Sequence, residues 1–186
     1  YALCMNDFDK AAMIADPCFL FRKMGMTPSP AQADILRHEG DELILAHRRF
    51  GKTLVEAVKA VNILISKPIL TGKPATVGAI SHTQDQAMEL IRAAKDCLWA
   101  IGEAGSMTTD NAQTIELENG GRFICRPQRE GSVRGYNFDR LLLDEASWID
   151  DAVQDAAEIA TARGGGRTSK MTTPMGARGR FYLDWK

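Results

Sequence analysis

Several features that would place a chain in a particular class of protein are missing from this 186-residue sequence. It has no apolar run of transmembrane length and no secretory signal, so we expect it to act in the cytoplasm. Its four cysteines form no C-x-x-C pair and its three histidines lack ligand spacing, which indicates neither a zinc site nor a disulfide framework. A formal net charge of −1 gives no general argument for a nucleic-acid partner, so any such contact must come from local clusters.

The composition favours a globular domain with a substantial core, since 45% of the residues are hydrophobic and 25% are charged. We expect one domain over residues 1–186, in which residues 1–29 form a lead-in arm and residues 30–186 the core. The chain begins with Tyr1 rather than Met and stops at Lys186, so we expect a fragment of a longer protein.

Strand and helix patterns alternate along the chain. Short apolar runs predict strands over residues 42–46, 75–80, 141–143 and 170–173. Periodic apolar residues predict helices over residues 7–15 and 150–162, and three more between them. The first of these three starts at Pro30 and carries Ala33 and Leu36, and the second follows Thr53 and carries Leu54 to Ile65. The third is opened by the capping-box pattern of Thr83 and Gln86 and ends at Gly102. Lys67-Pro68 marks the connection after the second of these three helices, and Asn119-Gly120-Gly121 predicts a hairpin between residues 114–118 and 122–126. This order predicts a three-layer α/β fold with a mainly parallel central sheet.

The stretch Ala46-His47-Arg48-Arg49-Phe50-Gly51-Lys52-Thr53 joins the first predicted strand to a helix. Strand, tight loop and helix opening on Gly-Lys-Thr is the context of a phosphate-binding loop, whose backbone N–H groups surround an anion at a helix N-terminus. Lys52 would reach the β- and γ-phosphates of ATP, and the Thr53 hydroxyl would hold Mg²⁺. The pattern ordinarily begins with Gly where this chain has Ala46, so a chance Gly-Lys-Thr at a helix start is the alternative.

Two adjacent carboxylates follow the apolar strand Leu141-Leu142-Leu143. An ATPase needs one carboxylate in the Mg²⁺ shell and a second to polarise a water for attack on the γ-phosphate. Asp144 and Glu145 supply this pair in the required place. The alternative is an ordinary helix-capping Asp-Glu, which the upstream Gly51-Lys52-Thr53 makes the weaker interpretation.

Three arginines are candidates for stabilising charge on the transferred phosphate. Arg48 and Arg49 lie inside the loop and would act on the nucleotide of their own chain. Arg134, in a glycine-containing loop before the carboxylate strand, would act on a neighbouring subunit. For each of them a surface or salt-bridging role is the alternative.

Two further motifs have a place in this chemistry. Gln32 precedes the phosphate loop and could read an adenine edge, although a solvated helix residue is the plainer interpretation. Thr172-Thr173 ends the last predicted strand and could sense the γ-phosphate through a hydroxyl, although threonine also has high β-propensity. The later part of the chain, residues 163–180, is locally basic, which is compatible with a DNA phosphate surface or with solvated charge.

Taken in order, these motifs resemble the ATPase domain of the large terminase subunit of tailed bacteriophages, the motor that packages DNA into a prohead. The likeness runs from about Asp16 to Tyr182. It rests on residues 30–32, 47–53, 81–87, 132–135, 141–146, 172–176 and 181–182. An arginine-rich phosphate loop without a leading Gly is a habit of that family, which accounts for Ala46.

The resemblance implies a P-loop fold of the ASCE type, with ATP and Mg²⁺ as cofactors. It implies Gln32 at the adenine and Asp144 and Thr53 on the metal, with Glu145 as the catalytic carboxylate. It also implies an arginine finger from Arg48 or Arg134, and nucleotide contacts made by His47, Arg48, Arg49, Phe50, Gly51, Lys52, Thr53, Thr172 and Thr173. Ala31 departs from the pattern of the family, because an aromatic residue often precedes the Gln in those proteins. Stacking of the adenine base on this position is therefore in doubt.

The resemblance further implies double-stranded DNA, a portal protein and a small terminase subunit as partners. It implies a homo-oligomeric ring as the active form, at the prohead portal in the host cytoplasm. No nuclease domain follows in this sequence, so we expect no DNA cleavage by this chain. Two alternatives are a DEAD-type helicase core, which needs a second motor domain, and a nucleotide-binding assembly module with little activity alone.

Overall fold

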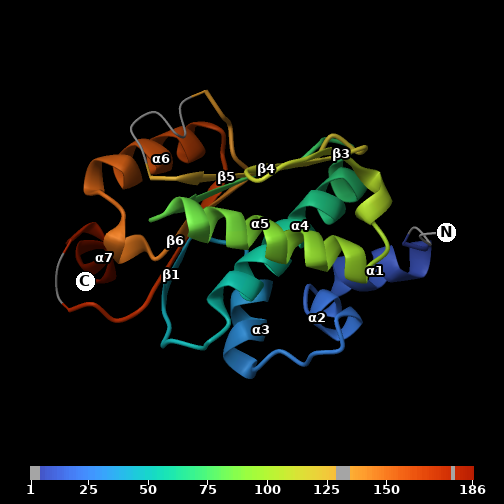
Figure 1. Ribbon diagram of the computed structural model, residues 1–186, viewed down its shortest axis with the longest axis horizontal. Helices are drawn as coiled ribbons and strands as arrows, with labels where there is room; N and C mark the ends of the chain where they lie inside the picture. The colour runs from blue at the N-terminus through green and yellow to red at the C-terminus, as the bar shows by residue number, and fades with distance from the viewer. Residues whose placement is uncertain (1–4, 129–134, 177–178) are drawn as a thin grey trace.

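A seven-stranded sheet runs through the centre of the molecule and confirms the predicted α/β fold (Figure 1). The computed structural model describes residues 5–128, 135–176 and 179–186. The strands are β1 (Glu42–Leu45), β2 (Thr76–Ser81), β3 (Met107–Asp110), β4 (Thr114–Leu117), β5 (Arg122–Pro127), β6 (Arg140–Asp144) and β7 (Arg167–Thr172). Their order across the sheet is β1-β7-β6-β2-β5-β4-β3.

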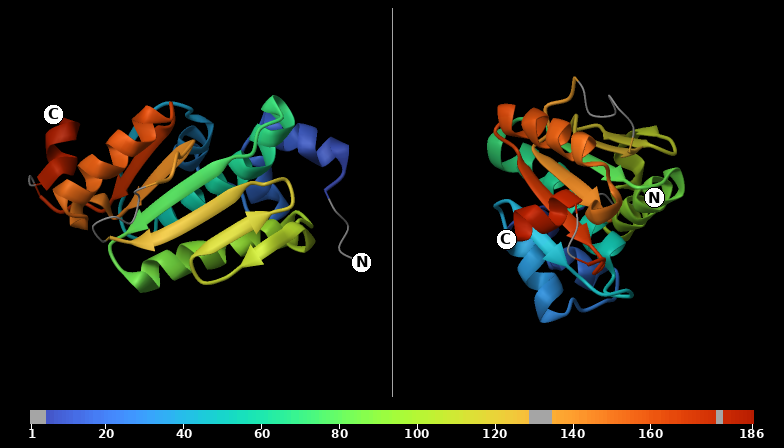
Figure 2. Two further views of the ribbon diagram at one scale, coloured as in Figure 1. Left: turned by 90° about the horizontal axis from the view of Figure 1, so that it is seen from above. Right: turned by 90° about the vertical axis from the view of Figure 1, so that its left-hand side faces the viewer.

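Most of the sheet is parallel. β1, β7, β6, β2 and β5 pair in parallel, whereas β4 is antiparallel to both β5 and β3. Figure 2 shows the β2 and β5 arrows pointing the same way and the β4 arrow opposing them. The predicted hairpin, β4 and β5, therefore lies next to the edge strand β3. Gly120 has φ 79 in its turn, a backbone conformation that glycine adopts without strain.

Helices cover both faces of the sheet. The helices are α1 (Asp7–Ala15), α2 (Phe19–Lys23), α3 (Pro30–Arg37), α4 (Lys52–Thr71), α5 (Gln84–Ala100), α6 (Asp151–Arg163) and α7 (Gly179–Trp185), with short 3₁₀ turns η1 (Ala104–Ser106) and η2 (Ala146–Trp148). One core cluster joins α1–α5 to one face, and a second joins η2, α6 and α7 to the other. The first helix, α1, and the last, α7, lie at opposite ends of the molecule (Figure 1).

The leucine run of β6 is buried on both faces, as its sequence predicts. Leu142 packs into the core under α4, while Leu141 and Leu143 pack into the core under α6. All three are 0% exposed. Because strand side chains alternate, the next residue that shares the face of Leu142 is Asp144.

Helix α4 is longer than predicted and continues through Lys67-Pro68 to Thr71. A proline inside a helix removes one backbone donor and leaves the carbonyl four residues earlier without its partner. Here that carbonyl belongs to Leu64, and the Asn119 side-chain amide donates to it at 3.0 Å. The helix ends at Gly72, which has φ 69 and donates its N–H to the Pro68 carbonyl.

Other boundaries follow the sequence where a local signal exists. The predicted capping box of Thr83 and Gln86 opens α5, with both reciprocal hydrogen bonds present. Strand β7 begins at Arg167 rather than at residue 170, because its first residues are polar and their pairing with β1 and β6 is not visible in sequence. The sequence patterns predict neither β3 nor α7, since β3 is half-exposed and Phe181 is the buried residue of α7.

Candidate active site

A cavity of about 300 Å³ lies where the phosphate loop meets the carboxyl end of β6. This is the edge of a parallel sheet at which ligands of α/β proteins are bound. Its lining comes from the loop, α4, α5 and the residues that end β6. The lining residues are Arg49, Phe50, Gly51, Lys52, Thr53, Gln86, Glu89, Asp144 and Glu145.

The loop has the backbone of an anion site. The Ala46 N–H donates to the Thr172 carbonyl at 3.0 Å, which ties the start of the loop to β7. Arg49 and Gly51 both have positive φ, 64 and 84, and the chain then turns directly into α4. The first N–H groups of a helix have no partner within it, so the start of α4 presents donors and a positive dipole end to the cavity.

The Glu145 carboxylate is held from two sides. Lys52 Nζ lies 3.2 Å from Glu145 Oε1. Oε2 accepts hydrogen bonds from the Thr173 N–H and hydroxyl, both at 3.0 Å, and from the Thr172 hydroxyl at 3.3 Å. Partial burial raises the pKa of Glu145, but the hydrogen bonds from Thr173 and Lys52 outweigh it and leave the pKa below its usual value. Glu145 is therefore ionised and fixed at the cavity.

Asp144 is the more buried of the two carboxylates, at 5% exposure. Burial, and then the charge of Glu145, raise its pKa to about 6, against the lowering effect of Lys52. Asp144 and Thr53 line the same cavity from facing elements. A carboxylate and a hydroxyl fit Mg²⁺, which is usually bound through one or two carboxylates together with substrate phosphates and water.

Gln32 contacts the phosphate loop from behind. Its side-chain amide donates to the Phe50 carbonyl at 2.7 Å, and its Oε1 accepts from the Ser29 N–H at 2.8 Å in the capping box of α3. A Cβ atom at Gly51 would lie 3.1 Å from the same amide nitrogen. The structure thus places Gln32 where it fixes the loop, and its contact with adenine stays a prediction.

The candidate arginines differ in position. Arg49 lines the cavity, whereas Arg48 is exposed and is not among the lining residues. His47 contacts the Arg48 carbonyl through Nδ1, and its ring packs edge-on against Phe50 with the centroids 6.0 Å apart. Arg134 lies outside the described residues. The choice of an arginine finger therefore stays open.

The sequence motifs assign no role in the site to three residues that lie near the cavity. Gln86 and Glu89 of α5 line it. Glu56 lies one turn after Lys52 on α4 and is 1% exposed. Burial, and then the charge of Asp144, raise the pKa of Glu56 well above its usual value. A glutamate among the apolar residues of a core helix is the signal that could have drawn attention to it.

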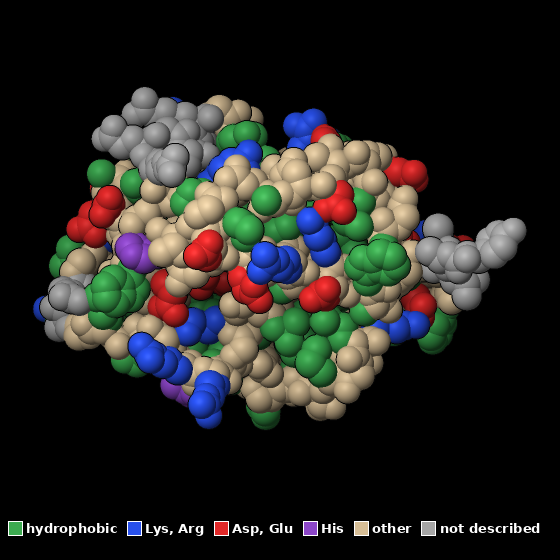
Figure 3. Space-filling model, viewed as in Figure 1, with side chains coloured by type: hydrophobic (Ala, Val, Ile, Leu, Met, Phe, Trp, Pro, Cys, Tyr) green, Lys and Arg blue, Asp and Glu red, His purple; other side chains and the backbone are tan. Residues whose placement is uncertain are grey.

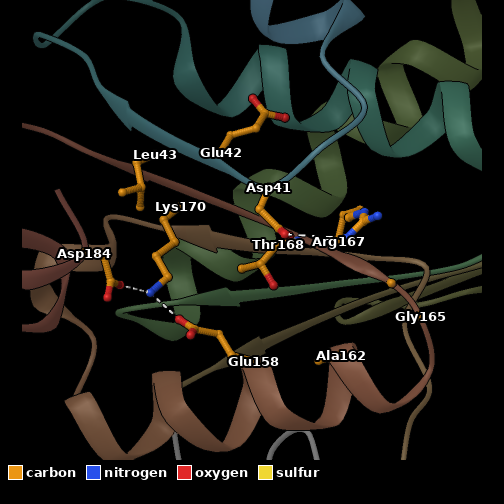
Figure 4. A pocket seen from close by; sticks show the side chains of 11 residues that line it. Asp41, Glu42, Leu43, Glu158, Ala162, Gly165, Arg167, Thr168, Lys170 and Asp184 are labelled. Carbon is orange, nitrogen blue, oxygen red and sulfur yellow. Dashed lines mark hydrogen bonds and ion pairs between the residues drawn. The ribbon is translucent and has the colours of Figure 1, made fainter.

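A larger cavity of about 610 Å³ lies elsewhere, between the start of β7 and helices α6 and α7 (Figure 4). Its central Lys170 forms ion pairs with Glu158 and Asp184. Arg167 lies 3.7 Å from Asp41 at its rim. These charges are paired with one another. The locally basic stretch 163–180 reaches this cavity through Arg167 and Lys170, but none of the predicted nucleotide-binding motifs contributes to its lining. The smaller cavity is therefore the candidate active site.

The surface around the site carries both signs of charge. In the view of Figure 3, the Lys and Arg side chains of the described residues are mixed with Asp and Glu rather than gathered into one basic surface. Within the described ranges, no helix combines the length and the apolar character needed to cross a membrane. Among the same residues, no three His, Cys, Asp or Glu side chains form a cluster suited to a metal ion.

The topology and the site define a class of fold. In the mostly parallel sheet, one strand, β7, separates the phosphate-loop strand β1 from the carboxylate strand β6. No protein-family model matches the chain. Comparison with solved structures is more specific, because the fold matches ATPase domains of phage large terminases over most of the chain.

Three such structures illustrate the match. The large terminase ATPase domain of Thermus phage P74-26 has a TM-score of 0.67 and 23% identity, covering 88% of this chain and 71% of that chain. The large terminase of bacteriophage HK97 has a TM-score of 0.66 and 13% identity, covering 90% and 38%. The large terminase of a thermophilic bacteriophage in complex with ADP has a TM-score of 0.58 and 15% identity, covering 97% and 41%.

Proposed function

We propose that this chain binds MgATP in the cavity at the phosphate loop and hydrolyses it. The observation that carries the proposal is the position of Glu145, an ionised carboxylate held by Lys52 and Thr173 at the edge of that cavity. The likeness to terminase structures, one of them in complex with ADP, supports the same activity.

Each binding residue has a role that follows from its chemistry. The N–H groups at the start of α4 would receive the phosphates, and the Lys52 ammonium would bind the γ-phosphate. Thr53 and Asp144 would hold Mg²⁺, which supplies charge stabilisation at the phosphate oxygens. Gln32 would contact adenine, or would orient the phosphate loop through its present hydrogen bond to the Phe50 carbonyl.

Glu145 would act in the chemical step. Its carboxylate would orient a water for attack on the γ-phosphate and accept a proton from it. As the new P–O bond forms, the bond from the γ-phosphorus to the bridging oxygen would break and ADP would leave. In this structure Lys52 is bonded to Glu145, so a γ-phosphate must draw Lys52 toward itself before the carboxylate is available to water. Thr172 and Thr173 hold the other carboxylate oxygen and would couple its position to β7.

We further propose that hydrolysis drives double-stranded DNA into a prohead. In this role a homo-oligomeric ring would work with a portal protein and a small terminase subunit in the host cytoplasm. The terminase fold supports this proposal. Arg48 in cis or Arg134 in trans would stabilise the transition state. The tie between Lys52 and Glu145 also favours a second candidate, a chain that binds nucleotide but turns it over slowly alone.

The proposal is tested first by nucleotide binding and turnover. Lys52→Ala should abolish MgATP binding measured by calorimetry, whereas Lys73→Ala, on the exposed turn after α4, should bind as the wild type does. Tight MgATP binding by Lys52→Ala would contradict the site. The process is tested by ATP-driven displacement of a triplex-forming strand, which reports movement along duplex DNA. Separation of the duplex strands instead would favour a helicase.

A further inference from the structure

The Glu56 carboxyl is buried behind the candidate active site without a partner. Glu56 is 1% exposed, and neither of its side-chain oxygens has a hydrogen-bond partner among the described residues. It lies four residues after Lys52 on α4, so both side chains occur on the same side of the helix. An acid in this position interrupts an otherwise apolar core.

The sheet presents two more polar groups to the same side. Val77 and Ala79 of β2, and Leu142 of β6, pack into the core under α4. Since strand side chains alternate, Ser81 and Asp144 share that face. They are register partners at the ends of β2 and β6. The Ser81 hydroxyl is also buried and lacks a hydrogen-bond partner among the described residues.

The chemistry of the group follows from its surroundings. An ionised carboxylate at this depth, with no hydrogen bond to compensate it, would be strongly disfavoured, so Glu56 is a neutral acid. A neutral carboxyl carries one O–H donor, and that donor needs an acceptor. The buried carboxylate on the facing strand is Asp144, which is also the carboxylate proposed to hold Mg²⁺.

We propose that Glu56 is a positioning residue for Asp144. Its O–H would donate to the Asp144 carboxylate through one buried water that the Ser81 hydroxyl also binds. This bond would fix the rotation of the carboxylate and turn its outer oxygen toward the cavity. Partners of this kind orient metal ligands, and their removal weakens metal affinity by roughly 10–100-fold. The inference rests on the proposed function, because it gives Asp144 its role.

A purely structural role for Glu56 predicts a different outcome. Methionine has a similar length and no buried polar oxygen, so as a packing residue it would serve at least as well as glutamate. A functional role instead predicts that Glu56→Met keeps or raises the melting temperature and weakens only Mg²⁺-dependent binding. Glu56→Gln keeps an uncharged donor and should preserve most of that binding.

The experiment compares the wild type, Glu56→Gln, Glu56→Met and the control Leu64→Met, a core substitution on the same helix far from the cavity. The affinity of each protein for a fluorescent ATP analogue is measured in buffer with Mg²⁺ and, separately, in buffer with EDTA. The melting temperature of each protein is measured without nucleotide. We expect the affinity of Glu56→Met for the ATP analogue to be lower than that of the wild type by about tenfold or more in Mg²⁺, and to be unchanged in EDTA. Glu56→Gln should stay within about threefold of the wild type, and Leu64→Met should match it.

Equal Mg²⁺-dependent affinity of Glu56→Met and wild type would overturn the inference. So would an equal loss in Mg²⁺ and EDTA, or a Glu56→Met chain that fails to fold, since each indicates a structural role. A wild-type chain that binds no MgATP would instead overturn the proposed function itself. The two failures are thus distinguishable.

Discussion

At the scale of single residues, the site gathers groups that oppose folding. Among the described residues, Arg49 and Glu145 are the two non-glycine residues with positive φ. A residue held in such a region costs about 1–3 kcal/mol. Asp144 and Glu56 add buried carboxyls with raised pKa. Substitutions that remove these groups should therefore raise the free energy of unfolding while they lower activity.

Glu145→Gln tests the chemical step. The amide keeps the shape of the side chain but cannot accept a proton, so we expect hydrolysis to fall by about 100-fold or more while ATP affinity is nearly unchanged. Single-turnover hydrolysis and nucleotide binding measure the two effects separately. Glu118→Gln, on the exposed turn between β4 and β5, is the matched control. Wild-type turnover in Glu145→Gln would move the catalytic role elsewhere.

Asp144→Asn tests the raised pKa of Asp144. A pKa of about 6 means that the native carboxyl binds its proton more tightly than the unfolded one, so ionisation destabilises the fold as the pH rises through about 6. We expect Asp144→Asn to raise the free energy of unfolding at pH 8 by about 1–3 kcal/mol, by about half as much near pH 5, and by little below the unfolded pKa of about 4. Denaturation in urea without Mg²⁺ checks this.

The same pKa sets the expected pH dependence of metal binding in the wild type. A proton on Asp144 competes with Mg²⁺, so the Mg²⁺ requirement for nucleotide binding should rise as the pH falls through about 6. A requirement that is flat between pH 5 and 8 would contradict this role for Asp144.

Local patterns indicated most of the side chains that line the cavity, because the phosphate loop and the Asp-Glu pair are each contiguous in sequence, but they did not indicate Gln86 and Glu89 of α5. They could not indicate the contact between Lys52 and Glu145, which joins two distant motifs. Nor could they show that Gln32 holds the Phe50 carbonyl. Such contacts depend on tertiary structure, which single-sequence patterns do not contain.

At the scale of elements, the sequence indicates most strands and helices but misplaces ends that are set by distant partners. Pro68 is a local signal for a helix end, yet α4 continues past it because Asn119 satisfies the carbonyl of Leu64. The short polar start of β7 is likewise paired on both sides by other strands. Where the signal is wholly local, as in the capping box of Thr83, the boundary is predicted correctly.

A double-mutant cycle tests the bridge between the hairpin and α4. Asn119→Ala leaves the Leu64 carbonyl without its donor, and we expect a loss of about 1–3 kcal/mol in the free energy of unfolding. In a Pro68→Ala background the N–H of residue 68 can bond the same carbonyl, so the loss should be at most about half as large. Urea denaturation measures both. Equal losses in the two backgrounds would show that the bridge to Leu64 contributes nothing.

At the scale of the whole molecule, the parallel sheet was predictable but the order of its strands was not. The alternation of strands and helices indicates a covered parallel sheet without stating which strands are neighbours. In the structure β7 lies between β1 and β6. The Thr172 carbonyl at its end contacts the start of the phosphate loop. The side chains of Thr172 and of Thr173, which follows β7, contact Glu145. The phosphate loop and the Asp-Glu pair are therefore both positioned by a third strand, β7.

A mixing experiment tests whether the active unit contains more than one chain. Arg134→Ala would lack the trans arginine and Lys52→Ala would lack nucleotide binding. If Arg134 acts on a neighbouring subunit, the mixture should regain part of the ATPase activity that each variant lacks, and wild-type specific activity should rise with protein concentration. An inactive mixture, with wild-type activity independent of concentration, would make Arg48 the better candidate.

The ion pair between Lys52 and Glu145 has a consequence for the end of each cycle. In the proposed cycle, Lys52 has two competing partners, the γ-phosphate and Glu145. Once the γ-phosphate has been cleaved, Glu145 can recover the ammonium and so weaken the hold of the loop on the products. ADP, which has no γ-phosphate, would then compete poorly with ATP. The chain would then keep its rate of ATP hydrolysis as ADP accumulates.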